Sequence, residues 1–344
     1  MVGFGYTIGW AVIHAGVRWS RRLPPTLVAP AEVIGQNRRV AIDAAVGDHT
    51  RQTEYSDPGE WAVLFDAIDP TVEAVSAMAR NVVAHYRAQA AELPESSRGD
   101  ISLRWVVAIL DTDQHRNPQP LTVERAVSKR VQGCCRDHSL LAVTALRHHG
   151  IPARDRVGFA KYLSPTWNHD HVIVESWLNG RWRRFDPEFA EPLPSLPDPT
   201  DIADGPDSPF LTAAHVWLGH RAGAVDVTRF GVAEGLGIGG DWFVYGYVIA
   251  EAAHRFGDEL LLWDTWGAMS GDLASVPSDH LALVDEVARL LVLADEGDLE
   301  AERALLDHYR HDSRLHPGTH IRSMSPDGGV YDVDLAARTT VQVS

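Results

Sequence analysis

Three residues of this 344-residue chain have the types that cysteine-dependent acyl chemistry requires: Cys135, His171 and Asp186. A cysteine nucleophile needs a position that favours thiolate, a base within hydrogen-bond reach and a group that orients the base. Cys135 follows Gly133 and Cys134 at the start of a predicted helix. Unpaired N–H groups and the helix dipole favour a thiolate there, and the same N–H groups could hold an oxyanion. The sequence therefore predicts a nucleophilic Cys135 with a lowered pKa.

The positions of the base and its partner follow from a predicted hairpin. Asn179-Gly180 is a strong signal for a two-residue turn between two strands. The register set by this turn places Ile173 opposite Asp186, and His171 shares a face with Ile173 because strand side chains alternate. Asp186 is then a diagonal neighbour of His171, roughly 7–8 Å away between backbones and within reach of a side-chain hydrogen bond. We expect His171 to act as the base and Asp186 to orient it.

Other residues compete for these roles or lie beside them. Cys134 is more simply a packing residue, and His169 is an alternative base on the same strand face as His171. Glu188 would replace Asp186 if the register shifted. Asp137 is expected to hydrogen-bond locally at the helix start, and Glu175 to be a structural carboxylate or one at the rim of the site.

The elements that must position these residues are readable from periodicity. Helical spacing predicts helices over about 69–91, 121–131, 135–149, 211–220, 242–256, 280–293 and 299–309. Strands are expected within 39–53, 153–162, 171–177 and 181–185, whereas the apolar segment 101–110 fits either state. The fold class is therefore α+β. We expect an N-terminal extension (1–36), a catalytic core (37–195) with a central helix packed on an antiparallel sheet, and a mostly helical C-terminal region (196–344) packed on the core.

Several motifs occur in the order found in one enzyme superfamily. They are Gly133-Cys134-Cys135-Arg136-Asp137, Gly150-Ile151-Pro152-Ala153-Arg154, His171 with Glu175 and Trp177, and Asp186-Pro187. Over about residues 121–189 this pattern resembles the transglutaminase-like superfamily. Residues 58–66 and 262–267 are also similar to a bacterial branch of that superfamily. The resemblance implies a papain-like fold and a thioester intermediate on Cys135, with no metal ion and no cofactor. Calcium, which some animal members of the superfamily use, is not expected because no acidic loop has the right spacing.

Composition limits the partners. The net charge of −16 argues against nucleic acid or an anionic membrane surface as a partner. The only two cysteines are adjacent, so no disulfide framework is expected, which favours the cytoplasm. The apolar segment 1–17 has its charges on the wrong side for a signal peptide and is too short for a membrane span, so we interpret it as part of the N-terminal extension.

The expected activity is acyl transfer from an amide, ester or thioester, resolved by water or an amine. The acyl donor is a peptide, a protein or a small molecule, with an amine acceptor in the case of transfer. An amide-forming acyltransferase of small-molecule biosynthesis and a non-catalytic binding scaffold are the alternatives.

Two further motifs need an interpretation. Gly235, Gly237 and Gly240 form a G-x-G-x-x-G pattern, but no buried strand is predicted before it, so nucleotide binding is not expected. The aromatic cluster at 263–267 is either domain packing or a substrate platform.

Overall fold

The structure, a computed structural model, describes residues 48–205 and 207–343. The N-terminal extension expected at 1–36 lies outside the described residues, as does most of the strand region expected within 39–53. The described part of that region, 48–53, contains a short 3-10 helix, Asp48–Thr50, and no strand.

The central sheet has five strands in the order β5-β4-β3-β6, with β7 paired to β4. Its strands are β3 (Ala153–Ala160), β4 (Asn168–Leu178), β5 (Arg181–Phe185), β6 (Phe210–Thr212) and β7 (Phe230–Gly231). Neighbours are antiparallel except β4 and β7. The hairpin register is confirmed, because Leu178 pairs with Arg181 and Val174 with Phe185. Asn179 and Gly180 have φ angles of 54° and 79°, the backbone conformation that this turn needs.

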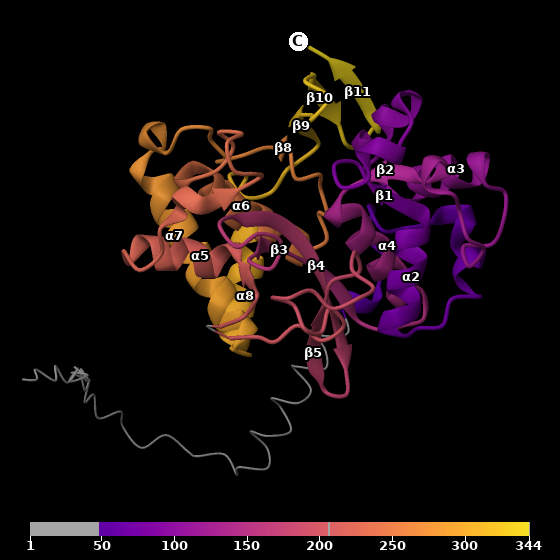
Figure 1. Cartoon of the computed structure of the whole chain (residues 1–344). Helices are drawn as coiled ribbons and strands as arrows, with labels where there is room; N and C mark the ends of the chain where they lie inside the picture. The colour runs from indigo at the N-terminus through magenta and orange to yellow at the C-terminus, as the bar shows by residue number, and fades with distance from the viewer. Residues whose placement is uncertain (1–47, 206, 344) are drawn as a thin grey trace, which may run out of the picture. The chain divides into compact units, whose positions relative to one another are not determined.

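Helix α4 (Cys135–His148) packs against β3 and β4. Every residue of α4 through Arg147 is buried, so this helix forms the centre of the core. Helix α6 (Asp241–Arg255) packs against β3, which is buried along its whole length, and Figure 1 shows α4 and α6 on opposite sides of β3 and β4. The molecule is thus an α+β protein with a papain-like arrangement of a central helix on an antiparallel sheet.

The segment before α4 differs from the prediction. The helix expected at 69–91 is α2 (Val72–Val82), capped by Thr71, and the chain then extends as β1 (Val83–His85). β1 pairs in parallel with β2 (Val131–Gly133), which leads directly into α4. The ambiguous apolar segment contributes to helix α3 (Val106–Arg116). The prediction of one long helix was wrong, because the backbone N–H and C=O groups after Val82 make their hydrogen bonds by pairing with β2.

The helix predicted at 121–131 is also wrong. Side chains bind the backbone there in place of helical hydrogen bonds. Asn81 Nδ2 donates to the carbonyls of Leu121 and Val123, and Arg125 Nη1 donates to Val123 as well. The Arg125 guanidinium is in turn held by buried Asp113 at 2.6 Å. The contacts of Asn81 and Asp113 with this segment join residues 12 to 42 positions apart, which helical periodicity does not report.

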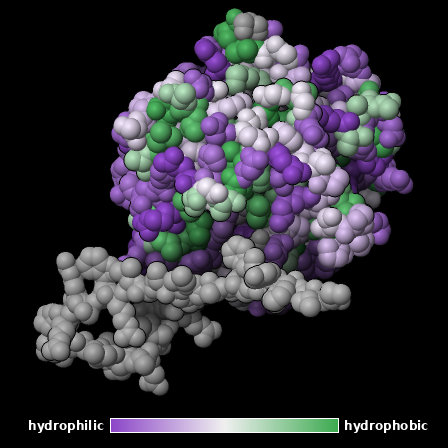
Figure 2. Space-filling model, turned by 60° about the vertical axis from the view of Figure 1, so that its left-hand side comes forward, coloured by the Kyte–Doolittle hydropathy of each residue, from purple (hydrophilic) through white to green (hydrophobic). Residues whose placement is uncertain are grey.

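The C-terminal helices follow the prediction closely. They are α5 (Ala213–Arg221), α6, α7 (Ser278–Asp295) and α8 (Leu299–His311). The short strands β8 (Asp264–Thr265), β9 (His320–Met324), β10 (Val330–Asp334) and β11 (Thr339–Gln342) form a separate antiparallel sheet that was not predicted. None of the described helices has the length and apolar character needed to cross a bilayer. Figure 2 shows one face of the molecule, where hydrophobic side chains form small patches among hydrophilic ones.

Candidate active site

Cys135 is the first residue of α4, and the turn before it is fixed by Asp137. The Asp137 carboxylate accepts the Cys134 N–H at 2.8 Å and lies 2.9 Å from Arg136 Nη1. A Cβ at Gly133 would lie 2.6 Å from Asp137 Oδ2, so this position has room only for glycine. The predicted local role of Asp137 is confirmed. Its hydrogen bond positions Cys135 at the helix start, where N–H groups lack partners within the helix.

His171 and Asp186 form a buried pair. His171 Nε2 lies 2.7 Å from Asp186 Oδ2, and the two side chains are 3% and 0% exposed. Because an ionised carboxylate only accepts hydrogen bonds, Nε2 carries the proton and Nδ1 is the ring atom able to accept one. Asp186 also accepts the Tyr162 hydroxyl at 2.5 Å and the Glu188 N–H at 3.0 Å. The diagonal contact expected from the hairpin register is therefore present.

The electrostatics of this pair favour a charged imidazolium. Burial lowers the pKa of His171, but the adjacent Asp186 charge and hydrogen bond outweigh it, so the pKa is raised above its usual value. Burial in turn raises the pKa of Asp186, whereas His171 and Tyr162 lower it, and the net shift is downward. Asp186 therefore stays ionised and can both orient His171 and stabilise its protonated form.

The thiol of Cys135 differs from the prediction of a lowered pKa. A hydrogen bond with Cys134 and burial raise the pKa of Cys135 well above its ordinary value, and the charges of Glu188 and Asp170 add to the shift. The surroundings of the buried side chain thus disfavour a further negative charge. These surroundings favour the neutral thiol form of Cys135.

A cleft with a volume of about 1120 Å³ connects these groups. Cys135 and His171 both line it, together with Cys134, Asp170 and Glu188. Asp186 lies behind His171 and is buried. The three predicted site residues are thus gathered at one place, with the thiol and the imidazole facing a shared space and the carboxylate beneath the imidazole.

The competing residues have other partners. His169 Nδ1 lies 2.9 Å from the carbonyl oxygen of Val232. Glu188 does not take the place of Asp186. Its Oε1 lies 4.0 Å from His85 Nε2, and its Oε2 has no hydrogen-bond partner among the described residues. Burial raises the pKa of Glu188, although His138 and His171 oppose this.

Two side chains near the site were missed by the sequence analysis. Tyr162 follows β3, and its hydroxyl lies next to Asp186 because the folded chain brings these two residues together. His85 lies in β1, a strand within the segment expected to be helical, and lines the cleft. His85 Nδ1 accepts backbone N–H groups of Arg87 and Ala88 at 3.2 and 3.3 Å, and burial lowers its pKa to about 4. No local sequence signal marks either residue.

One group of residues has metal-ligand types. His171, Asp186 and Glu188 each offer one ligand atom, and these atoms lie within 4.8 Å of one another. However, Asp186 Oδ2 already accepts hydrogen bonds from His171 and Tyr162 at 2.7 and 2.5 Å. This engagement favours proton transfer as the use of these groups.

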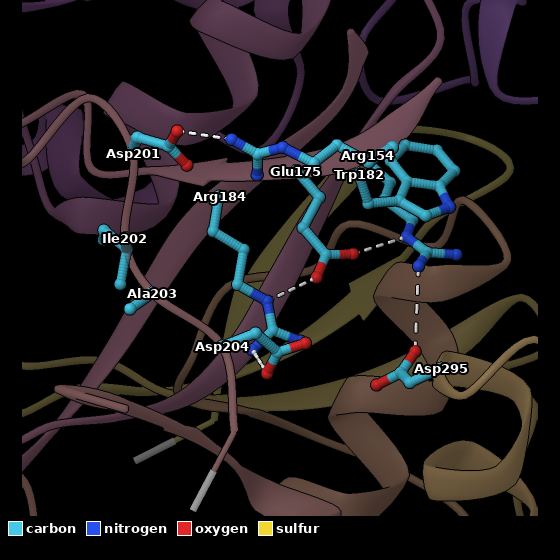
Figure 3. Close-up of a pocket in the computed structure, with 10 residues that line it drawn as sticks. Arg154, Glu175, Trp182, Arg184, Asp201, Ile202, Ala203, Asp204 and Asp295 are labelled. Carbon is cyan, nitrogen blue, oxygen red and sulfur yellow. Dashed lines mark hydrogen bonds and ion pairs between the residues drawn. The ribbon is translucent and has the colours of Figure 1, made fainter. Parts of the chain in front are cut away.

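A second pocket, of about 340 Å³, lies at the far end of β4 and β5. Figure 3 shows Glu175 between Arg154 and Arg184, with Asp295 on the other side of Arg154. Glu175 accepts hydrogen bonds from Arg154 at 2.9 Å and Arg184 at 2.7 Å, and Arg156 binds Asp295 at 2.7 Å. Burial raises the pKa of Glu175, but the surrounding arginines hold it well below the usual value. Glu175 is a structural carboxylate that ties β4 to α7.

The comparisons with known proteins bear on the core. A family model described as Transglutaminase-like superfamily matches residues 66–187. A solved structure from Cytophaga hutchinsonii, named a "Putative Cysteine Protease", is similar at 23% sequence identity with a TM-score of 0.31. The match covers 51% of this chain and 53% of that one, so the chain spans about half the length of the protein it matches. No curated protein matches the chain.

Proposed function

Because residues 66–187 belong to the transglutaminase-like superfamily, we propose that this protein is a cysteine-dependent acyl-transfer enzyme. Cys135 is the nucleophile, His171 is the general base and Asp186 orients His171. The observation that carries the proposal is the buried His171–Asp186 pair, 2.7 Å apart, at the cleft that Cys135 also lines. A base held by a carboxylate and facing a nucleophile is the arrangement that covalent catalysis requires.

In the first half-reaction His171 takes the Cys135 proton while Sγ bonds to the carbonyl carbon of an amide, ester or thioester. The bond to the leaving group then breaks, and the leaving group takes the proton from His171. In the second half-reaction water or an amine gives its proton to His171 as it bonds to the acyl carbon. The S–C bond breaks, and Cys135 recovers the proton. The N–H groups at the start of α4 are the expected donors to the oxyanion.

The neutral resting thiol determines how the proton moves. Since the pKa of Cys135 is raised, a resting thiolate–imidazolium pair is not favoured. Proton transfer to His171 then accompanies attack on the carbonyl, as in general-base catalysis. His171 must be neutral beforehand to accept that proton.

One observation favours an amine acceptor as the second candidate. The carboxylates of Asp170 and Glu188 line the cleft with Cys135. These carboxylates attract an amine in its ammonium form and can take its extra proton, so that the free amine then attacks the acyl carbon, whereas water gains nothing comparable from them. Amide formation is therefore the alternative to hydrolysis, and added amines that divert product from acid to amide would identify it.

The test is acylation of the protein by p-nitrophenyl acetate. We expect a burst of p-nitrophenol equal to the enzyme concentration and an acetyl group on the peptide that contains Cys135, located by mass spectrometry. Cys135→Ala should lose both signals, whereas Cys134→Ala should keep the acetyl group on Cys135. An undiminished burst in Cys135→Ala would contradict the proposal, and absence of acylation in the unaltered protein would favour a binding scaffold.

A further inference from the structure

The large cleft is unusually apolar away from Cys135. Among the described residues, eight large hydrophobic side chains are exposed, and four of them line this one cleft: Leu163, Leu236, Ile238 and Met324. Aromatic side chains extend the same lining, among them Trp242, Trp263 and Trp266. Exposed apolar side chains that gather in one cleft mark a ligand-binding surface more often than chance exposure does.

Charge excludes several kinds of occupant. Among the described residues that line the cleft, Arg87 is the single Lys or Arg, and it is exposed above the Tyr86 ring. The carboxylates are Asp170, Glu188 and Asp264, and Asp264 is held by buried Arg104 at 2.7 Å. Away from His171 and Arg87, a phosphate-bearing or carboxylate-bearing tail would meet these acids without a compensating cation in the described lining. The lining suits a neutral, apolar group.

One loop carries two of the exposed side chains. Leu236 and Ile238 are 54% and 43% exposed and lie between β7 and α6. We call residues 232–240 the cleft loop. It contains the G-x-G-x-x-G pattern, and Gly235, Gly237 and Gly240 have φ angles of 83°, 69° and 90°. These glycines permit a tight loop that other residues would strain.

The stem of the cleft loop is fixed beside the candidate active site. Val232 N–H donates to the Ile238 carbonyl at 2.9 Å, and Gly240 N–H donates to Phe230 at 2.9 Å. The preceding strand β7 pairs with β4 at His169, two residues before His171. The loop is thus attached to the strand that carries the proposed base, and its apolar tip faces the same cleft.

We propose that the cleft binds an acyl donor with an extended, neutral, apolar acyl group, and that Leu236 and Ile238 set the acyl length accepted. The proposal rests on the proposed function, because it identifies the cleft as the acyl side of the Cys135 reaction. The volume of about 1120 Å³ is large enough for such a chain. In this proposal the glycines of the G-x-G-x-x-G pattern shape the cleft loop, which forms one side of the cleft.

The test compares p-nitrophenyl acetate, butyrate and octanoate below their aggregation concentrations. We expect kcat/KM for octanoate to exceed that for acetate by on the order of 10-fold or more, the usual discrimination of an apolar pocket. The double variant Leu236→Ser with Ile238→Ser should reduce this ratio to about 2-fold or less. The matched control is Val341→Ser with Val343→Ser, which changes side chains of similar exposure, 62% and 48%, outside the cleft. It should keep the ratio of the unaltered protein.

A second measurement separates this inference from the proposed function. Octanamide and acetamide are titrated calorimetrically into Cys135→Ala, alone and combined with the two loop substitutions. Preferential octanamide binding that the loop substitutions weaken supports the cleft assignment even if ester hydrolysis does not depend on Cys135. An unchanged chain-length ratio in the loop variant overturns the inference. So does a loop variant that alters only the oligomeric mass in light scattering, since a second copy would then cover the cleft.

Discussion

At the scale of single residues, the site depends on which groups are charged at rest. Asp186 holds the pKa of His171 above its usual value despite burial, whereas Cys134 and burial raise the pKa of Cys135. The proton therefore rests on sulfur, and His171 is available as a base only above its own raised pKa. The pH dependence of acyl transfer should report this arrangement.

Replacing Asp186 tests whether its charge raises the pKa of His171. In the unaltered protein kcat/KM should fall as pH drops through the raised pKa of His171, which lies above the ordinary value of about 6.5. Asp186→Asn removes the charge that raises this pKa, so the acid limb should move to lower pH. The maximum should fall roughly 10²- to 10⁴-fold because the ring loses its orienting partner. Rate–pH profiles measure both effects, and Asp198→Asn, an exposed control, should change neither. An unmoved limb in Asp186→Asn would contradict the role of Asp186.

At the scale of elements, buried ion pairs hold the hairpin of β4 and β5 in place. Glu175 lies four residues from His171 on β4 and binds Arg154, Arg156 and Arg184, and Arg156 continues the network to Asp295 at the end of α7. The same strand that carries the proposed base is therefore attached to the C-terminal helices. The contribution of this network to the free energy of unfolding can be measured.

Glu175→Gln should lower the free energy of unfolding by about 3–5 kcal/mol, because it leaves buried guanidinium groups without their carboxylate. Urea denaturation at neutral pH measures the change. Glu286→Gln on α7 breaks the exposed pair with Arg289, with side chains 40% and 52% exposed, and should cost no more than about 0.5 kcal/mol. Equal effects of the two substitutions would show that the network does not stabilise the hairpin.

The sign of the pH dependence follows from Glu175. Its folded pKa lies below the unfolded value of about 4.3. The stabilisation from this carboxylate is therefore present above the unfolded pKa and is lost as pH falls toward the folded value. Unfolding curves recorded at decreasing pH should show a smaller difference between the unaltered protein and Glu175→Gln.

Elements with strong local signals were predictable, and those formed by distant contacts were not. Asn179-Gly180 fixed the hairpin register because a two-residue turn leaves one pairing, and that register brings Asp186 to His171. By contrast, Leu121 and Val123 lie in a segment of helical periodicity whose carbonyls are bound by Asn81. The proximity of Tyr162 to Asp186 likewise arises from packing and has no counterpart in periodicity.

At the scale of the whole molecule, the described residues, 48–205 and 207–343, belong to one compact unit. β6 (Phe210–Thr212) and β7 (Phe230–Gly231) come from the C-terminal half but complete the central sheet through β3 and β4. Arg104 and Asp264, 160 residues apart, form a buried pair at 2.7 Å. Loss of the C-terminal half would therefore expose the sheet and leave charges unpaired.

We expect the chain to unfold in one transition. Differential scanning calorimetry should give equal calorimetric and van't Hoff enthalpies, because neither half can bury its part of the core alone. Tryptophan fluorescence and far-ultraviolet circular dichroism should report the same midpoint. Two separated transitions would mean that the two halves are stable independently of the shared sheet.

The effect of Cys134 on the pKa of Cys135 has a consequence for survival under oxidative stress. Peroxides react with thiolates and scarcely with thiols, so susceptibility to sulfenic acid formation follows thiolate content. Cys135 is buried, and Cys134 raises the pKa of its thiol, which favours the neutral form. The protein should therefore keep its nucleophile through exposure to hydrogen peroxide that inactivates low-pKa cysteine enzymes, and Cys134→Ala should make Cys135 more easily oxidised. In this view Cys134 protects the nucleophile between turnovers.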